Sequence, residues 1–102
     1  MDQVNENSTA YLTVAFADKT GAPAVPTSAT YRIDDVTNNV PIRGVTALTP
    51  AASIEITLVP ADNAISGRAS EIHRVTVTAQ YGGATDAVNS EYDYQVVNLR
   101  YV

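Results

Sequence analysis

The residues with the clearest capacity for chemistry in this chain are few. His73 is the one histidine among 102 residues, and cysteine is absent. A zinc or iron site would need further His or Cys ligands, and a serine triad would need a strained Gly-x-Ser-x-Gly turn, which the sequence lacks. Because His73 stands at the start of a predicted strand, we expect it on the surface or at the rim of the domain.

The acidic residues are the second group of candidates. Asp34 and Asp35 are neighbours in a predicted strand, where successive side chains point to opposite faces, so a regular backbone prevents them from acting as a catalytic pair. Asp62 lies in a predicted loop, but the Asp-rich spacing of a calcium loop is missing. We therefore expect solvated acids at these positions, no enzyme activity, and no bound metal or cofactor.

The segments that carry these residues have the composition and periodicity of β-strands. Valine and threonine are abundant and there are six tyrosines, which suits a pleated, half-buried surface. Apolar residues alternate with polar ones in six segments, at 11–17, 27–35, 40–43, 53–59, 74–81 and 90–99. Gly44 is expected to end the third segment, and Gly82-Gly83 predicts a hairpin turn.

This pattern predicts an all-β fold. Short strands with turn signals at roughly ten-residue spacing favour an immunoglobulin-like, two-sheet Greek-key sandwich of about seven strands over a closed barrel. At most one short helical turn is expected, near 60–67, between Pro60 and Gly67. Without cysteine or tryptophan the two sheets lack the disulfide and ring that pin antibody domains, so packing or neighbouring subunits must stabilise them.

The charge and the first residues limit the partners. The net charge is −5 and the six Lys and Arg are spread singly, whereas nucleic acids and anionic membranes attract clustered cations, so neither is an expected partner. Residues 1–7, MDQVNEN, are polar and predict a flexible N-terminal arm before a single domain at 8–102. They do not have the character of a signal peptide, so we expect synthesis in a cytoplasm.

Several segments resemble, in order and in type, a known group of proteins. The most distinctive is PTSATYRIDD at 26–35, and the others include EYDYQVVNL at 91–99. From about Asn7 to Leu99 the chain is similar to small Ig-like proteins encoded among the virion structural genes of tailed phages and prophages. The resemblance implies a virion protein, made in the host cytoplasm, that decorates the capsid or belongs to the head–tail junction or the tail.

The implied partners are other virion proteins: the major capsid protein, or portal and tail components, with a homo-oligomer in the assembly. Tyr92 and Tyr94 share one strand face and either pack in the core or form a contact surface, since tyrosine is enriched at interfaces. The N-terminal arm and the end of the chain are the other candidates for contact. The candidate subunit contacts are Val4, Tyr92, Tyr94, Leu99, Tyr101 and Val102.

Two other functions are weighed against this one. A recognition module would bind carbohydrate or a host receptor through its loops, but the predicted loops at 18–26, 36–39, 60–70 and 82–89 carry no aromatic residue. A small enzyme would need a nucleophile and a base in proximity, and the sequence offers no such pair. The sequence therefore favours a non-enzymatic structural protein, with the recognition module as the alternative.

Overall fold

The computed structural model describes residues 2–65, 69–82 and 86–99. These residues form an all-β fold with seven strands and one 3₁₀ turn. The elements are β1 (Asp2–Asn5), β2 (Ala10–Ala15), β3 (Ser28–Asp35), β4 (Val40–Leu48), β5 (Ser53–Leu58), η1 (Pro60–Asn63), β6 (Ser70–Gln80) and β7 (Ala87–Val97). Among the described residues, no helix has the length and apolar character needed to cross a membrane.

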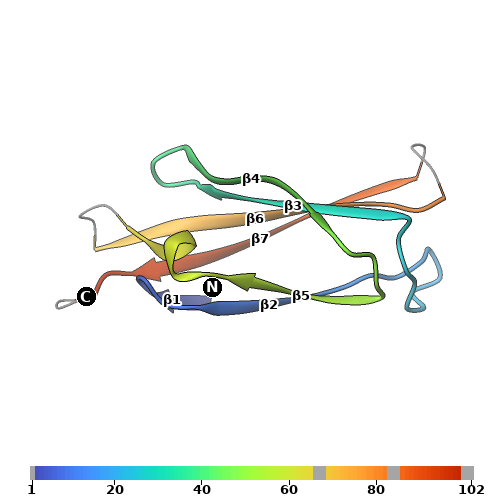
Figure 1. Ribbon diagram of the computed structural model, residues 1–102, viewed down its shortest axis with the longest axis horizontal. Helices are drawn as coiled ribbons and strands as arrows, with labels where there is room; N and C mark the ends of the chain where they lie inside the picture. Colours follow the sequence, from blue (N-terminus) through green and yellow to red (C-terminus); the bar gives the residue numbers. More distant parts are fainter. Residues whose placement is uncertain (1, 66–68, 83–85, 100–102) are drawn as a thin grey trace.

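The strands form two sheets that face each other along the long axis of the molecule (Figure 1). The larger sheet has the order β1-β7-β6-β3-β4, and the smaller sheet consists of β2 and β5. Neighbouring strands are antiparallel except β1 and β7, which run parallel. The result is an elongated body of 47 × 21 × 21 Å.

The core lies between the two sheets and follows the predicted alternation. In β3, Ala29, Tyr31 and Ile33 are buried while Arg32 is exposed. The other core residues come from both sheets and are Phe16, Ile56, Leu58, Val75, Val77, Ala79, Tyr94 and Val96. Period-two burial of β-branched and aromatic side chains therefore accounts for the two-layer arrangement.

The predicted hairpin is formed by β6 and β7, and residues 83–85 of its predicted turn lie outside the described residues. β6 and β7 pair without interruption from Ser70↔Val97 to Gln80↔Ala87, as a hairpin requires, and Gly82 supplies a left-handed φ of 67° at the connection. The predicted helical turn is η1, which starts at Pro60 and ends earlier than the sequence indicated, at Asn63. Residues 66–67 of that prediction lie outside the described residues.

The prediction that Gly44 ends a short strand is wrong. β4 continues through Gly44 to Leu48, because the pairing with β3 shifts register between Tyr31 and Ile33. The partners of Tyr31 and Ile33 are Thr46 and Arg43, so β4 accommodates an extra residue there as a bulge. Pro41 lies on the edge strand of the sheet, where the missing N–H is tolerated.

The prediction of a flexible arm at 1–7 is also wrong for residues 2–7. β1 pairs with the end of β7 from Asp2↔Tyr94 to Asn5↔Val97, and Val4 packs against the core. The Glu6 N–H then donates to the Val97 carbonyl at 2.9 Å. The exposed polar side chains of this segment show no strand pattern, because the strand is held largely by its backbone hydrogen bonds.

Glu6 is a sensitive point of this attachment. Its side chain is buried, and Oε1 accepts a 2.7 Å hydrogen bond from the Leu99 N–H. We expect Glu6→Ala to lower the free energy of unfolding by about 1–3 kcal/mol, because the half-buried Leu99 N–H loses its partner. Urea denaturation measures this, with the exposed Asn5→Ala as the matched control; equal values for the two variants would contradict the assigned role of Glu6.

Candidate functional site

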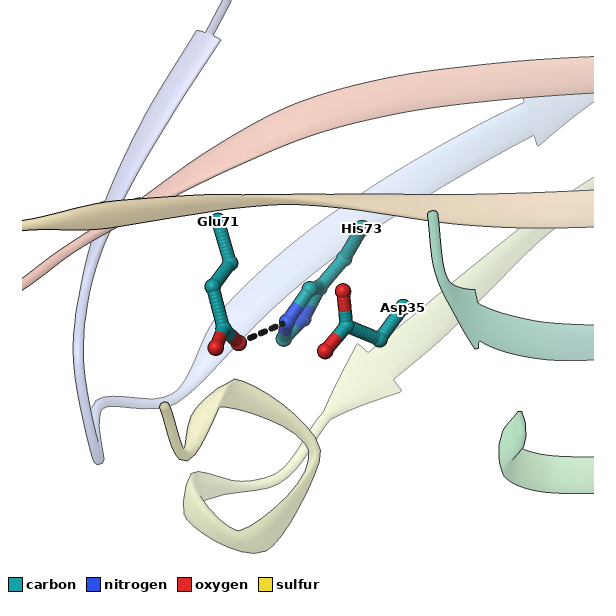
Figure 2. A group of neighbouring side chains, drawn as sticks. All are labelled: Asp35, Glu71 and His73. Atoms are coloured by element: carbon teal, nitrogen blue, oxygen red, sulfur yellow. Dashed lines mark hydrogen bonds and ion pairs between the residues drawn. The ribbon is translucent and has the colours of Figure 1, made fainter. Parts of the chain in front are cut away.

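Three titratable side chains are buried together at one end of the sandwich. Asp35 ends β3, and Glu71 and His73 lie near the start of β6. Their exposed fractions are 6%, 2% and 0%. Figure 2 shows the three side chains on the same side of β6, directed toward one small region. This group, Asp35, Glu71 and His73, is called the buried triad below.

The strand register explains why these residues meet. The inward face of β6 continues from Val75 back to His73 and Glu71, because side chains two apart share a face. Asp35 is the direct pairing partner of His73 across the β3–β6 ladder. The triad therefore results from the regular geometry of two adjacent strands.

Short contacts connect the triad with the turn that follows β3. His73 Nε2 lies 3.2 Å from Glu71 Oε1. Asn38 donates from Nδ2 to Asp35 Oδ2 at 2.7 Å and to Glu71 Oε2 at 2.8 Å, and its backbone N–H donates to Asp35 Oδ1 at 3.0 Å. One amide group thus bridges the two carboxylates.

The electrostatic state of Asp35 follows from these contacts. Burial has the largest influence and raises the pKa of Asp35, since an ionised carboxylate loses hydration. The side-chain and backbone hydrogen bonds from Asn38, together with His73 and Glu71, lower it by more, so the pKa lies below its ordinary value. Asp35 is therefore a buried negative charge at neutral pH.

One of the two ring nitrogens of His73 lacks a hydrogen-bond partner among the described residues. This atom, Nδ1, is buried. The ring meets the edge of Tyr94, with centroids 5.6 Å apart and planes at 76°. The prediction that His73 lies on the surface is wrong, and so is the prediction of solvated acids for Asp35.

A second polar group surrounds Tyr94 and η1. The Tyr94 hydroxyl donates to Asn63 Oδ1 at 2.9 Å, and Asn63 Nδ2 donates to the Ser8 carbonyl at 2.6 Å. Burial is the main reason that the pKa of Tyr94 is raised, and the charge of Asp62 acts in the same direction. This chain of hydrogen bonds links β7, η1 and the segment before β2.

Asp62 is held beside this group by an ion pair. The Arg43 guanidinium contacts Asp62 through Nη2 at 2.9 Å and 3.0 Å and through Nε at 3.2 Å, and the Val59 N–H donates to the same carboxylate at 2.9 Å. The hydrogen bond with Asp62 is the main reason that the pKa of Arg43 is raised. The predicted solvated acid at position 62 is therefore wrong as well.

The outer face of the larger sheet is charged and solvated. Arg32 pairs with Asp34 at 2.7 Å, and Arg74 pairs with Asp93 at 2.7 Å. Asp34 and Asp35 point to opposite faces, as predicted. The acids on this outer face, Asp34 and Asp93, are partly exposed to solvent, as expected for acids on a sheet surface.

The candidate subunit contacts differ in how far they are buried. Tyr94 is fully buried, so its prediction as a contact residue is wrong and its core alternative is confirmed. Val4 and Tyr92 are half-buried against the core, and the Tyr92 hydroxyl donates to Asp2 Oδ2. That hydrogen bond is the main reason that the pKa of Tyr92 is raised to about 12. Leu99 is half-buried, and Tyr101 and Val102 lie outside the described residues.

Sequence reasoning missed Glu71 and Asn38. The signal for Glu71 was available, because it shares strand parity with His73, Val75 and Val77. The strand was predicted to start at Arg74, so its alternation was not extended back to Glu71. Asn38 gave no such signal, because an Asn in a turn is ordinary. What the triad provides chemically is two carboxylates and one imidazole, which suit proton exchange or binding of a cation.

Comparison with known proteins finds no matching family, no similar curated protein and no similar solved structure.

Proposed function

We propose that this chain is a non-enzymatic structural protein of a tailed-phage virion that binds other virion proteins. The resemblance of its segments to virion Ig-like proteins supports the setting, and the strand order β1-β7-β6-β3-β4 opposite β2-β5 supports an immunoglobulin-like Greek key. One further observation carries the proposal: an apolar groove on the open side of the sandwich, flanked by strand edges.

The groove lies between β2 and the middle of the larger sheet. Two adjoining hollows of about 230 Å³ each are lined by side chains of β2, β6 and β7. The apolar lining residues include Leu12, Val14, Val75, Val77, Val88 and Tyr92. A groove of this kind between two sheets accepts apolar side chains of an extended segment.

The strand edges beside the groove are open. β1 pairs only with Tyr94–Val97, so within the described residues no strand covers the outer edge of β7 at 87–93. An extended segment of another protein can add a strand at such an edge, with backbone hydrogen bonds providing affinity and the groove providing specificity. The edge at β4 differs, because Pro41 and the bulge at Gly44 protect it from strand addition.

Val88 gives a test of this surface. It lies on β7 at the rim of the groove with 49% of its surface exposed, so Val88→Lys places a charge there without opening the core. We expect the copy number of the protein in purified particles to fall by about tenfold or more, which corresponds to about 1.4 kcal/mol of lost binding. Quantitative mass spectrometry of particles measures this.

Val45→Lys is the matched control. Val45 lies on the protected β4 edge and is 70% exposed. This variant is expected to be incorporated like the wild type. Absence of the wild-type protein from purified particles would overturn the virion assignment, and equal incorporation of the Val88 and Val45 variants would overturn the role of the groove.

A further inference from the structure

The buried triad has the residue types of a cation site. Asp35, Glu71 and His73 each offer one ligand atom, and these atoms all lie within 4.8 Å of one another. Carboxylate oxygen and imidazole nitrogen are both ordinary ligands of divalent cations in proteins. The ligands come from the end of β3 and the start of β6, which fix their relative positions through direct strand pairing (Figure 2).

A second observation comes from the imidazole itself. His73 is fully buried, and Nδ1 has no hydrogen-bond partner among the described residues. When Nε2 carries the proton and donates to Glu71, Nδ1 holds a lone pair that no donor satisfies. A metal ion satisfies such a lone pair. Glu71 Oε1 then fixes the tautomer of the ring, as carboxylates do for metal-binding histidines, while Glu71 Oε2, which faces Asn38, is the oxygen offered to the ion.

Asn38 lies against both carboxylates of the triad. Its Nδ2 group lies between the two carboxylates, 2.7 Å from Asp35 and 2.8 Å from Glu71, where positive charge is favoured. Rotation of the side-chain amide exchanges this nitrogen for Oδ1, which is an oxygen ligand. Asn38 is half-buried in the turn between β3 and β4, which places it between the triad and the solvent-facing turn.

We propose that Asp35, Glu71 and His73 form a structural binding site for a divalent first-row cation, with Zn²⁺ as the best fit. The imidazole favours Zn²⁺ over Mg²⁺ and Ca²⁺, which prefer ligand sets made of oxygen. The bound ion would tie the end of β3 to the start of β6. This site goes beyond the proposed virion function and does not depend on it.

The experiment uses the full chain without an affinity tag, treated with chelator and dialysed. Zn²⁺ is titrated by calorimetry and by thermal unfolding, with Mg²⁺ in a parallel titration. We expect one Zn²⁺ per chain, and a rise of at least about 10 °C in the unfolding midpoint at 100 times Kd. Since His73 is the one histidine, its ¹⁵N imidazole resonances report directly on coordination and should shift with Zn²⁺.

Asp35→Asn and Asp34→Asn form a matched pair, because these neighbours point to opposite faces of β3. Asp35→Asn should weaken Zn²⁺ binding by at least about 100-fold, because loss of a charged ligand costs no less than loss of an outer-shell partner, which reaches about 100-fold. Asp34→Asn should bind like the wild type. The proposal is overturned if the imidazole resonances of the wild type do not move with Zn²⁺, if both variants bind Zn²⁺ equally, or if Mg²⁺ binds as tightly as Zn²⁺. If Asp35→Asn fails to fold, the resonances of the wild type still decide the question.

Discussion

Tyr94→Ala is expected to lower the free energy of unfolding by about 3–5 kcal/mol, as truncation of a large buried side chain does. Tyr94 is fully buried in β7 and packs against His73 on one side and Tyr92 on the other, with centroids 5.6 Å and 6.3 Å apart. Its hydroxyl also satisfies Asn63. The free energy of unfolding of a domain of this size is about 5–15 kcal/mol in total, so Tyr94→Ala removes a large part of it.

Urea denaturation followed by circular dichroism measures this loss. Tyr94→Phe separates the ring from the hydroxyl and should cost about 1–2 kcal/mol, because Asn63 Oδ1 loses its donor while the packing stays. Tyr11→Ala is the matched control: Tyr11 lies on the outer face of β2 and is exposed, so its effect should stay within about 1 kcal/mol. If Tyr94→Ala were as mild as Tyr11→Ala, the buried position of Tyr94 would be contradicted.

The fold could be predicted from the sequence wherever side chains alternate strictly. Ala29, Tyr31 and Ile33 were expected inward and are buried, and the same holds for Val75, Val77 and Ala79. Such patterns are visible because apolar burial provides most of the free energy that places a strand.

The parts that escaped prediction depend on backbone pairing. β1 joins the sheet parallel to β7 while three of its four side chains are exposed, so no side-chain pattern reveals it. β4 continues past Gly44 because the bulge lets it stay paired with β3. Pairing partners distant in sequence decide both cases, and a single strand carries little information about them.

The buried polar groups escaped prediction for a different reason. Charged residues are seldom buried unless they are paired, so Asp35 and Asp62 were expected in solvent, and Glu71 was not considered. Glu71 and Asp62 are buried with partners from other segments, Asn38 and Arg43, and Asp35 is held by Asn38 from the turn after its own strand. The parity of β6 points inward at Glu71 and His73, but the strand was predicted to start at Arg74, so the pattern was not extended back to them.

The ion pair of Arg43 and Asp62 should respond asymmetrically to substitution. The side chain of Asp62 is 5% exposed, whereas that of Arg43 is 34% exposed. Arg43→Gln leaves a buried, unpaired carboxylate and should lower the free energy of unfolding by about 3 kcal/mol. Asp62→Asn leaves a guanidinium that solvent reaches, and the Asn oxygen can still accept from the Val59 N–H, so the expected loss is about 1–2 kcal/mol.

Urea denaturation of both variants at one pH measures this asymmetry. The larger loss is expected for Arg43→Gln, because the buried partner is the one left without its counter-charge. A loss for Arg43→Gln no larger than that for Asp62→Asn would mean that Asp62 is solvated once its partner is removed, and that burial does not set the cost of separating this pair.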